Sequence, residues 1–349
     1  MRRVLTLALT TTFVATALAA CSSGGGGGAK TVTLVTHDSF AASKSVLAAF
    51  TAQTGYKVRV LKNGDAGAAL NQVVLTKDAP LGDAFYGVDN TFLTRALDEK
   101  VFDVYRPKAL ASVTPSLRLD PTGHATPVDF GDVCINWDKK YYGARFVVPP
   151  RSLEDLTQPR YKDQLVVENP ATSSTGLAFV AATVAKYGDK WLDYWDRLRA
   201  NGVRVVDGWD QAYDGEFSGA AGSKGTRPLV VSYASSPPAE VYFAKPQPTT
   251  APTGSLDSSC FRQVEFVGVL HGAAHPAAAR KLIDFMLSRT FQADMPLQMF
   301  VYPSVTGTSL PPVFTKFSTV TPDPLTLTPA QIGRERKQWI EQWTAHVLR

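Results

Sequence analysis

Three residues directly ahead of a predicted helix could hold an anion or a hydroxyl group. Ser173, Ser174 and Thr175 lead into a helical pattern that runs from Gly176 to Tyr187. The first backbone N–H groups of a helix lack partners inside it, and the helix dipole favours negative charge there. Ser and Thr at this position are also ordinary N-caps, so both interpretations stay open.

Two aromatic residues stand where predicted strands end. Trp209 follows the strand predicted over residues 203–206, and Tyr233 ends the strand predicted over residues 229–233. Aromatic faces bind flat or cationic rings. An isolated aromatic residue more often packs in a core, so position alone does not assign these two to a site.

Three polar residues occupy turns near the ends of early strands. Asp38 and Ser39 follow the first strand, and Asp65 begins a helix. A carboxylate here could balance a positive charge or accept hydrogen bonds from an amino group. A simple N-cap explains Asp65 equally well, and the same ambiguity holds for the other two.

Short strands alternate with amphipathic helices, the pattern of a mostly parallel sheet covered by helices. The predicted strands cover residues 31–36, 57–61, 84–88, 133–137, 165–167, 203–206, 229–233 and 260–270. The predicted helices cover residues 43–51, 66–75, 91–99, 176–187, 190–199, 276–287 and 328–347. A second α/β unit begins near residue 127. Open α/β sheets bind ligands beyond the carboxyl ends of their strands, so two facing units predict a cleft that closes around a small molecule.

Composition and motifs argue against several classes of function. The formal charge is +5 and becomes +3 without residues 1–20, and the basic residues are scattered, so we expect no nucleic-acid partner. The chain has no Walker A loop, no Gly-x-Ser-x-Gly elbow and no close-set His/Cys pair for zinc. We therefore expect neither an enzyme nor a metal or cofactor, with a hydrolase as the alternative if distant residues meet in the fold.

The N-terminus has the order of a secretory signal peptide over residues 1–20. Two arginines precede an apolar run over residues 4–18, and small residues precede Cys21. The four residues that end at Cys21 resemble the bacterial lipobox, whose cysteine becomes acylated; an ordinary signal peptide is the alternative. We expect a lipidated Cys21 and a Gly-rich tether over residues 21–30 that hold the protein on the extracytoplasmic face of the cell membrane.

The other two cysteines, Cys134 and Cys260, would stand in a compartment where disulfides persist. A disulfide between them is the simplest expectation. Two buried free thiols are the alternative, because a sequence does not give the distance between two residues.

Ten short segments follow one another in the order seen in a known family. They are His37-Asp38-Ser39-Phe40-Ala41-Ala42, Gly87-Val88-Asp89-Asn90, Val128-Asp129-Phe130-Gly131, Asn169 to Leu177, Gly208-Trp209, Ala212-Tyr213, Val231-Ser232-Tyr233, Ser235-Ser236-Pro237, Gln263-Val264-Glu265 and Tyr302-Pro303. In this order they resemble the thiamine-binding proteins of bacterial ABC importers, which are two-lobed periplasmic binding proteins. The resemblance implies a monomeric receptor that binds thiamine, or its phosphates, and delivers it to ABC permease subunits.

The resemblance also implies a type 2 periplasmic-binding-protein fold, in which two mixed sheets flanked by helices form two lobes with a ligand cleft between them. Lobe one would comprise residues 31–128 and 264–312, and lobe two residues 129–263. Residues 313–349 would form a C-terminal segment whose helix packs on the lobes.

Site roles follow from the same resemblance. It assigns Ser173 and Ser174 to the hydroxyethyl tail of thiamine, Trp209 and Tyr233 to the two rings, and Asp65 to the amino group or the thiazolium charge. Asp38 and Ser39 complete the edge of the crevice.

Three aromatic positions of the predicted site depart from the family pattern, and we still expect His37 and Phe300, which occupy two of them, to contact the ligand. His37 stands where relatives have tyrosine, Phe300 stands where they have tryptophan, and Pro238-Ala239 stand where another tyrosine is expected, with Tyr242 three residues later. A protonated His37 would repel a thiazolium ring. The three changed positions leave another cationic or aromatic small molecule as an alternative ligand.

Two further alternatives share parts of this prediction. Ferric receptors of similar build bind iron through neighbouring tyrosines, and Tyr141-Tyr142 is the only adjacent pair in the chain. This pair lies in a charged turn, and we interpret it as structural. A surface adhesin would explain the anchor but not the polar and aromatic loops at the strand ends.

Overall fold

The computed structural model describes residues 30–349. The predicted signal peptide over residues 1–20, the lipidation of Cys21 and nearly all of the tether lie outside the described residues. Among residues 30–349, no helix combines the length and the apolar character needed to cross a bilayer.

Ten strands form one hydrogen-bonded mixed sheet, which confirms the α/β architecture. The strand order is β2-β1-β3-β9-β5-β8-β6-β7, with β4 beside β9 and β10 beside β5. The strands are β1 (Lys30–Thr36), β2 (Tyr56–Lys62), β3 (Ala84–Asp89), β4 (Phe102–Asp103), β5 (Thr126–Asp138), β6 (Leu165–Glu168), β7 (Arg204–Val206), β8 (Leu229–Tyr233), β9 (Thr253–Leu270) and β10 (Tyr302–Pro303). β1 is parallel to β2 and β3, and β6 is parallel to β7 and β8, whereas β5 and β9 are antiparallel to each other.

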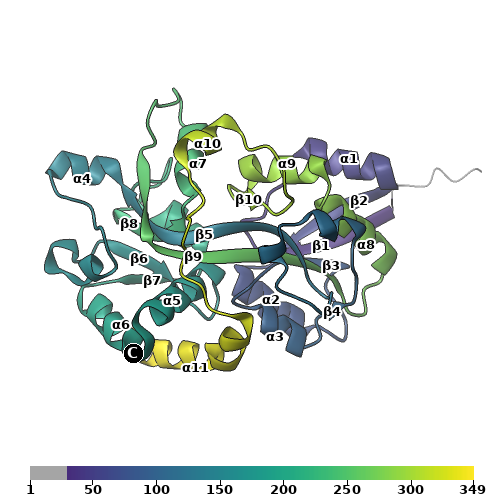
Figure 1. Cartoon of the computed structure of the whole chain (residues 1–349), viewed down its shortest axis with the longest axis horizontal. Coiled ribbons are helices and arrows are strands. Elements are labelled where there is room, and N and C mark those ends of the chain that lie inside the picture. The colour runs from purple at the N-terminus through teal and green to yellow at the C-terminus, as the bar shows by residue number, and fades with distance from the viewer. Residues whose placement is uncertain (1–29) are drawn as a thin grey trace, which may run out of the picture.

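The two longest strands, β5 and β9, run through the centre of the molecule (Figure 1) and pair over much of their length. β1, β2 and β3 lie on one side of this pair, and β6, β7 and β8 lie on the other. We call these groups, with their helices, the β1–β3 half and the β6–β8 half. β9 pairs with β3 of one half, β5 pairs with β8 of the other, and β5 and β9 pair with each other. The structure therefore has one continuous sheet where two were expected from the sequence.

Helices cover both halves. The α-helices are α1 (Lys44–Thr54), α2 (Ala66–Leu75), α3 (Leu93–Asp98), α4 (Lys139–Arg145), α5 (Ser174–Tyr187), α6 (Trp191–Ala200), α7 (Ser236–Phe243), α8 (Pro276–Met286), α9 (Arg289–Gln298), α10 (Pro312–Phe317) and α11 (Pro329–Val347). Local chemistry sets their ends. Ser43 accepts a hydrogen bond from the N–H of Val46 at the start of α1, and Gly55, with a φ of +75°, ends that helix.

The last helix, α11, packs on both halves. It lies between α3 and α6 along one face of the molecule (Figure 1). Near its start, a Cβ on Gly333 would lie 3.0 Å from the side chain of Thr94, and near its end the Trp343 ring lies 5.4 Å from that of Trp195. Trp343 is fully buried, so α11 closes the large hydrophobic core that runs through both halves.

A disulfide joins Cys134 of β5 to Cys260 of β9. Both cysteines are buried and pack against Ala234. The bond closes a loop across 126 positions of sequence and ties together the two strands that carry both halves.

Replacing both cysteines by alanine is expected to lower the free energy of unfolding by about 2–4 kcal/mol, because the cross-link restricts the unfolded chain. Guanidinium denaturation of Cys134→Ala/Cys260→Ala against the wild type measures this. Wild-type protein treated with dithiothreitol is the control, since reduction breaks the bond and keeps both cysteine side chains. Coincident unfolding curves for oxidised and reduced protein would contradict the prediction.

Candidate ligand-binding site

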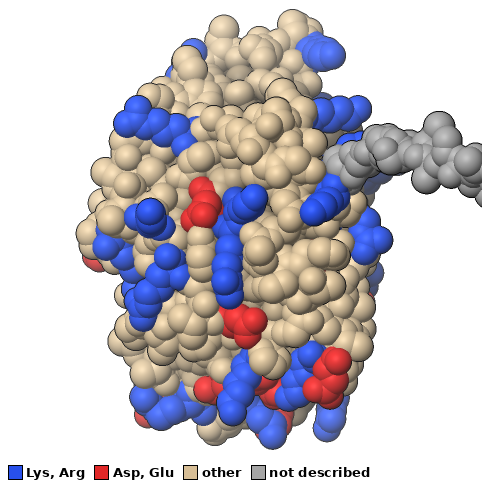
Figure 2. Space-filling model, turned by 90° about the vertical axis from the view of Figure 1, so that its right-hand side faces the viewer, with Lys and Arg blue, Asp and Glu red and all other residues tan. Residues whose placement is uncertain are grey.

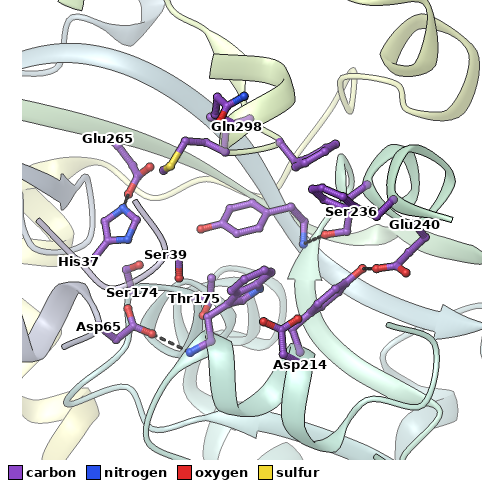
Figure 3. Close-up of a pocket in the computed structure, with 18 of the residues that line it drawn as sticks. His37, Ser39, Asp65, Ser174, Thr175, Asp214, Ser236, Glu240, Glu265 and Gln298 are labelled. Carbon is purple, nitrogen blue, oxygen red and sulfur yellow. Dashed lines mark hydrogen bonds and ion pairs between the residues drawn. The ribbon is translucent and has the colours of Figure 1, made fainter. Parts of the chain in front are cut away.

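A cavity of about 280 Å³ lies where the two halves meet (Figure 3). Its size is near the lower end of the range of small-molecule sites, about 300 Å³. Seven of the nine residues predicted to bind a ligand line it: His37, Ser39, Asp65, Ser174, Trp209, Tyr233 and Phe300. Thr175, from the segment predicted to hold an anion or a hydroxyl group, lines it as well. Other lining residues, to which no ligand contact was assigned above, are Tyr213, Asp214, Ser236, Ala239, Glu240, Phe243, Glu265 and Gln298.

The structure places the other two predicted residues, Asp38 and Ser173, outside the lining. Asp38 accepts a hydrogen bond from the N–H of Gly64 at 3.0 Å. Ser173 is fully buried as the N-cap of α5, where its hydroxyl accepts from the N–H of Gly176 and lies 2.9 Å from the Thr175 hydroxyl. The cap interpretation therefore describes Ser173, while Ser174 and Thr175 face the cavity from the first turn of α5.

Asp65 joins the two halves at the edge of the cavity. One carboxylate oxygen caps α2 by accepting from the N–H of Ala66 at 2.5 Å, and the other accepts from the N–H of Trp209 at 2.8 Å. Burial raises the pKa of Asp65, and these two hydrogen bonds offset part of that effect. Two further contacts cross the same edge, from Ser39 to Asp210 at 2.5 Å and from Ala68 N–H to the Thr172 carbonyl at 3.0 Å.

Aromatic rings form the apolar walls. Trp209 stacks on Tyr213 with ring centres 4.9 Å apart and planes only 13° apart, and its indole N–H donates to the Ser232 hydroxyl. Tyr213 belongs to a short π-helix, η6 (Gln211–Glu216). The Tyr233 hydroxyl donates to Gln263 at 2.6 Å, which fixes that ring at the end of β8. These contacts hold flat aromatic faces in place before any ligand arrives.

Carboxylates stand at both ends of the cavity. Figure 3 shows Glu265 beside His37 at one end, with Glu240 and Asp214 at the other. Glu240 accepts hydrogen bonds from the Tyr213 hydroxyl and the Ala221 N–H, and burial raises its pKa. No Lys or Arg is among the described residues that line the cavity. The site is therefore suited to a flat ligand that carries positive charge.

Of the residues at or near the aromatic positions that depart from the family pattern, some line the cavity and one does not. Phe300 lines the cavity, and Ala239 leaves room where a tyrosine was expected. Tyr242 lies outside the lining and is 39% exposed, but the next residue of α7, Phe243, lines the cavity and packs on Phe300 at 5.5 Å. Sequence reasoning missed Phe243 because no helix was predicted over α7.

The adjacent tyrosines lie away from the cavity, in α4. Tyr142 is buried and donates to Gln164 at 2.7 Å, and Tyr141 packs under Arg145 at 4.0 Å. In the described part of the chain, no three His, Cys, Asp or Glu side chains are grouped closely enough to hold a metal ion. The contacts of Tyr141 and Tyr142 support the structural interpretation of this pair.

Two α/β halves on a pair of long shared strands, with a pocket of aromatic and polar side chains between them, are the architecture of a two-lobed binding protein. The chain belongs to the family of bacterial extracellular solute-binding proteins, whose model matches residues 79–316. It is 29% identical over 326 residues to the thiamine-binding periplasmic protein of Salmonella typhimurium strain LT2, which covers 91% of this chain and 94% of that relative.

Solved structures agree with this family. A periplasmic thiamin binding protein superposes with a TM-score of 0.80 at 27% identity, over 91% of this chain and 96% of that one. Iron-bound HitA of Pseudomonas aeruginosa superposes with a TM-score of 0.70 at 22% identity, over 91% of this chain and 99% of that one. The similarity to HitA supports the fold only.

Proposed function

We propose that the protein is an extracytoplasmic receptor that binds thiamine and delivers it to the permease of an ABC importer. The observation that carries the proposal is the lining of the cavity, which combines stacked aromatic faces with carboxylates and has no Lys or Arg among its described residues. The thiazolium ring of thiamine is a flat cation, and its aminopyrimidine ring is a flat hydrogen-bonding group. The thiamine-binding relatives support the same ligand.

The contacts of the cavity suggest a pose. The free face of Trp209 and the ring of Tyr233 would hold the two rings of thiamine, since Trp209 already uses its other face on Tyr213. Asp65 or Glu265 would face the positive charge. The hydroxyethyl tail, or a phosphate on it, would meet Ser174 at the first turn of α5, where backbone N–H groups favour an oxygen ligand.

The proposed lobes, residues 31–128 with 264–312 and residues 129–263, would move about the β5–β9 pair. The two boundaries are neighbours in space, because Asp129 pairs with Glu265 and Phe130 pairs with Val264. Rotation at this point would separate Asp65 from Trp209, which are joined across the cleft. A ligand that contacts both sides binds the closed arrangement better and so shifts the hinge toward it.

Export, anchoring through Cys21 and a monomeric state are parts of the same proposal.

The charged edge of the sheet supports the monomeric state. Figure 2 looks onto the end of the molecule that carries α1, β2 and α8, where Lys and Arg outnumber acidic residues. The edge strand β2 exposes Lys57, Arg59 and Lys62. Charges on an edge strand oppose pairing with another copy, which favours a monomer.

Titration of thiamine into soluble protein that begins at Ser22 tests the proposal. We expect saturable one-to-one binding by calorimetry, recovery of unchanged thiamine on release, and no comparable binding of ferric ion. Thiamine phosphates, titrated in the same way, show whether the Ser174 end accepts a phosphate. Absence of binding to thiamine and its phosphates, or conversion of thiamine into a product at catalytic rates, would overturn the proposed function.

A further inference from the structure

His37 and Glu265 form a buried, poorly aligned ion pair at one end of the cavity (Figure 3). The imidazole Nε2 lies 3.3 Å from a Glu265 carboxylate oxygen, and the residues are only 7% and 5% exposed. Nε2 nevertheless has no aligned hydrogen-bond partner. Gly87, with a φ of +107°, leaves room for the ring, because a Cβ there would overlap the imidazole Cδ2. The pair is therefore held in place by packing, and its hydrogen bonding is weak.

Every element around His37 presents acidic or neutral groups to it. Glu265 faces it from β9, Asp65 from the start of α2, and Asp210 from the segment before η6. Tyr86 of β3 packs its ring 5.6 Å away. Burial lowers the pKa of His37, but the three carboxylates outweigh burial, with Glu265 the strongest, and the net pKa is raised. Before a ligand binds, the surrounding carboxylates therefore favour the protonated form of the imidazole.

The carboxylate of Glu265 is part of a larger buried cluster on the two central strands. The Tyr86 hydroxyl lies 2.9 Å from a Glu265 oxygen and 2.6 Å from an Asp129 oxygen, and one hydroxyl proton cannot serve both fully. Burial and the neighbouring Glu265 raise the pKa of Asp129, whereas His37 and the hydrogen bonds to Glu265 outweigh burial and lower the pKa of Glu265. Of these two carboxyl groups, Glu265 therefore favours the charged form, which faces His37.

A second cation that enters beside this pair meets the imidazolium as a like charge and competes with it for the Glu265 carboxylate. Thiamine brings such a cation. Loss of the His37 proton to the solvent removes this repulsion, after which Glu265 faces the thiazolium ring. Neutral imidazole can still donate or accept one hydrogen bond, so it need not leave the pocket.

We propose that thiamine displaces a proton from His37, and that Glu265 exchanges the imidazolium for the ligand as its counter-ion. The inference rests on the proposed function, because it needs a cationic ligand in this cavity. Thiamine affinity should then fall by about tenfold for each pH unit below the pKa of His37 in the ligand-free protein, and should be flat above it.

Calorimetric titrations of thiamine from about pH 5.5 to about pH 8.5 measure the protons released, when each pH is covered by two buffers that hold it and take up protons with different heats. The variants His37→Gln and Glu265→Gln each remove one member of the pair. His271→Gln is the matched control, since His271 is exposed and pairs with Asp103 away from the cavity. The aminopyrimidine of thiamine takes up a proton of its own in acid. The His37→Gln variant lacks the imidazole, so its titrations measure the proton exchange of the ligand alone.

We expect proton release in the wild type and in His271→Gln, and its loss in His37→Gln together with a flatter pH profile. If His37→Gln does not fold, loss of release in Glu265→Gln supports the same inference. Equal apparent heats in both buffers across the range, with normal thiamine binding, would overturn the inference and leave the proposed function intact. No binding at any pH would overturn both.

Discussion

Trp209→Ala is expected to weaken thiamine binding by about 100-fold. The indole supplies an aromatic face, held by stacking on Tyr213 and by a hydrogen bond to Ser232. A desolvated cation–π contact contributes about 2 kcal/mol, and the stacking of a ring about 1 kcal/mol more. Together these make about 3 kcal/mol, or two factors of ten in Kd. Calorimetric titration of the variant measures the loss directly.

Trp209→Phe separates the aromatic face from the hydrogen bond. It keeps a flat ring and loses the donor to Ser232, so we expect a loss of about tenfold or less. Tyr141→Ala is the matched control outside the cavity, where Tyr141 packs on Arg145 and Tyr142. Wild-type affinity in a folded Trp209→Ala variant would remove Trp209 from the site.

Asp65→Asn is expected to lower thiamine affinity by about 10- to 100-fold, which is the effect of losing about 1.5–3 kcal/mol of charge-assisted interaction. Asparagine is as good an N-cap as aspartate, and its side-chain oxygen can still accept one of the two N–H groups, from Ala66 or Trp209. The main change is therefore the loss of negative charge beside the ligand. Titration at neutral pH measures the effect, with Asp38→Asn as the control because Asp38 lies outside the lining.

The Asp65→Asn substitution is expected to affect the free energy of unfolding differently from the affinity for thiamine. The folded-state pKa of Asp65 is raised, so folding favours its protonated form. The free energy of unfolding then falls as the pH rises from the ordinary carboxyl pKa to the raised one, and Asn removes this dependence. We expect Asp65→Asn to be at least as stable as the wild type above that window. A variant that loses both affinity and stability at neutral pH would show that Asp65 is mainly structural.

The regular parts of the fold could be predicted from the sequence because they have strong periodicity. The helix over residues 66–75 and the strand over residues 229–233 have the predicted bounds. α9 was missed because Pro296 lies inside it, and α7 was missed because Pro237 and Pro238 stand in its first turn. Proline argues against a helix wherever its position relative to the first turn is unknown.

The candidate site was predicted less completely because its walls come from distant segments. For Asp65 the sequence left two roles open, and the structure realises the cap with one oxygen and the contact with Trp209 with the other. Glu240 and Phe243 could not be found without α7. Glu265 belonged to a matching segment, but only the pairing of β5 with β9 and the place of His37 show that its carboxylate is buried at the cavity.

The position of α11 has a mechanical consequence. The helix rests on α3 of the β1–β3 half and on α6 of the β6–β8 half, so a rotation that parts the halves must also make it slide over at least one of them. Its packing beside Thr94 and against Trp195 would then oppose a rotation that opens the cleft. Substitutions in the last twenty or so residues can therefore tune how fast the cleft opens, and hence how fast cargo is released, without touching the pocket.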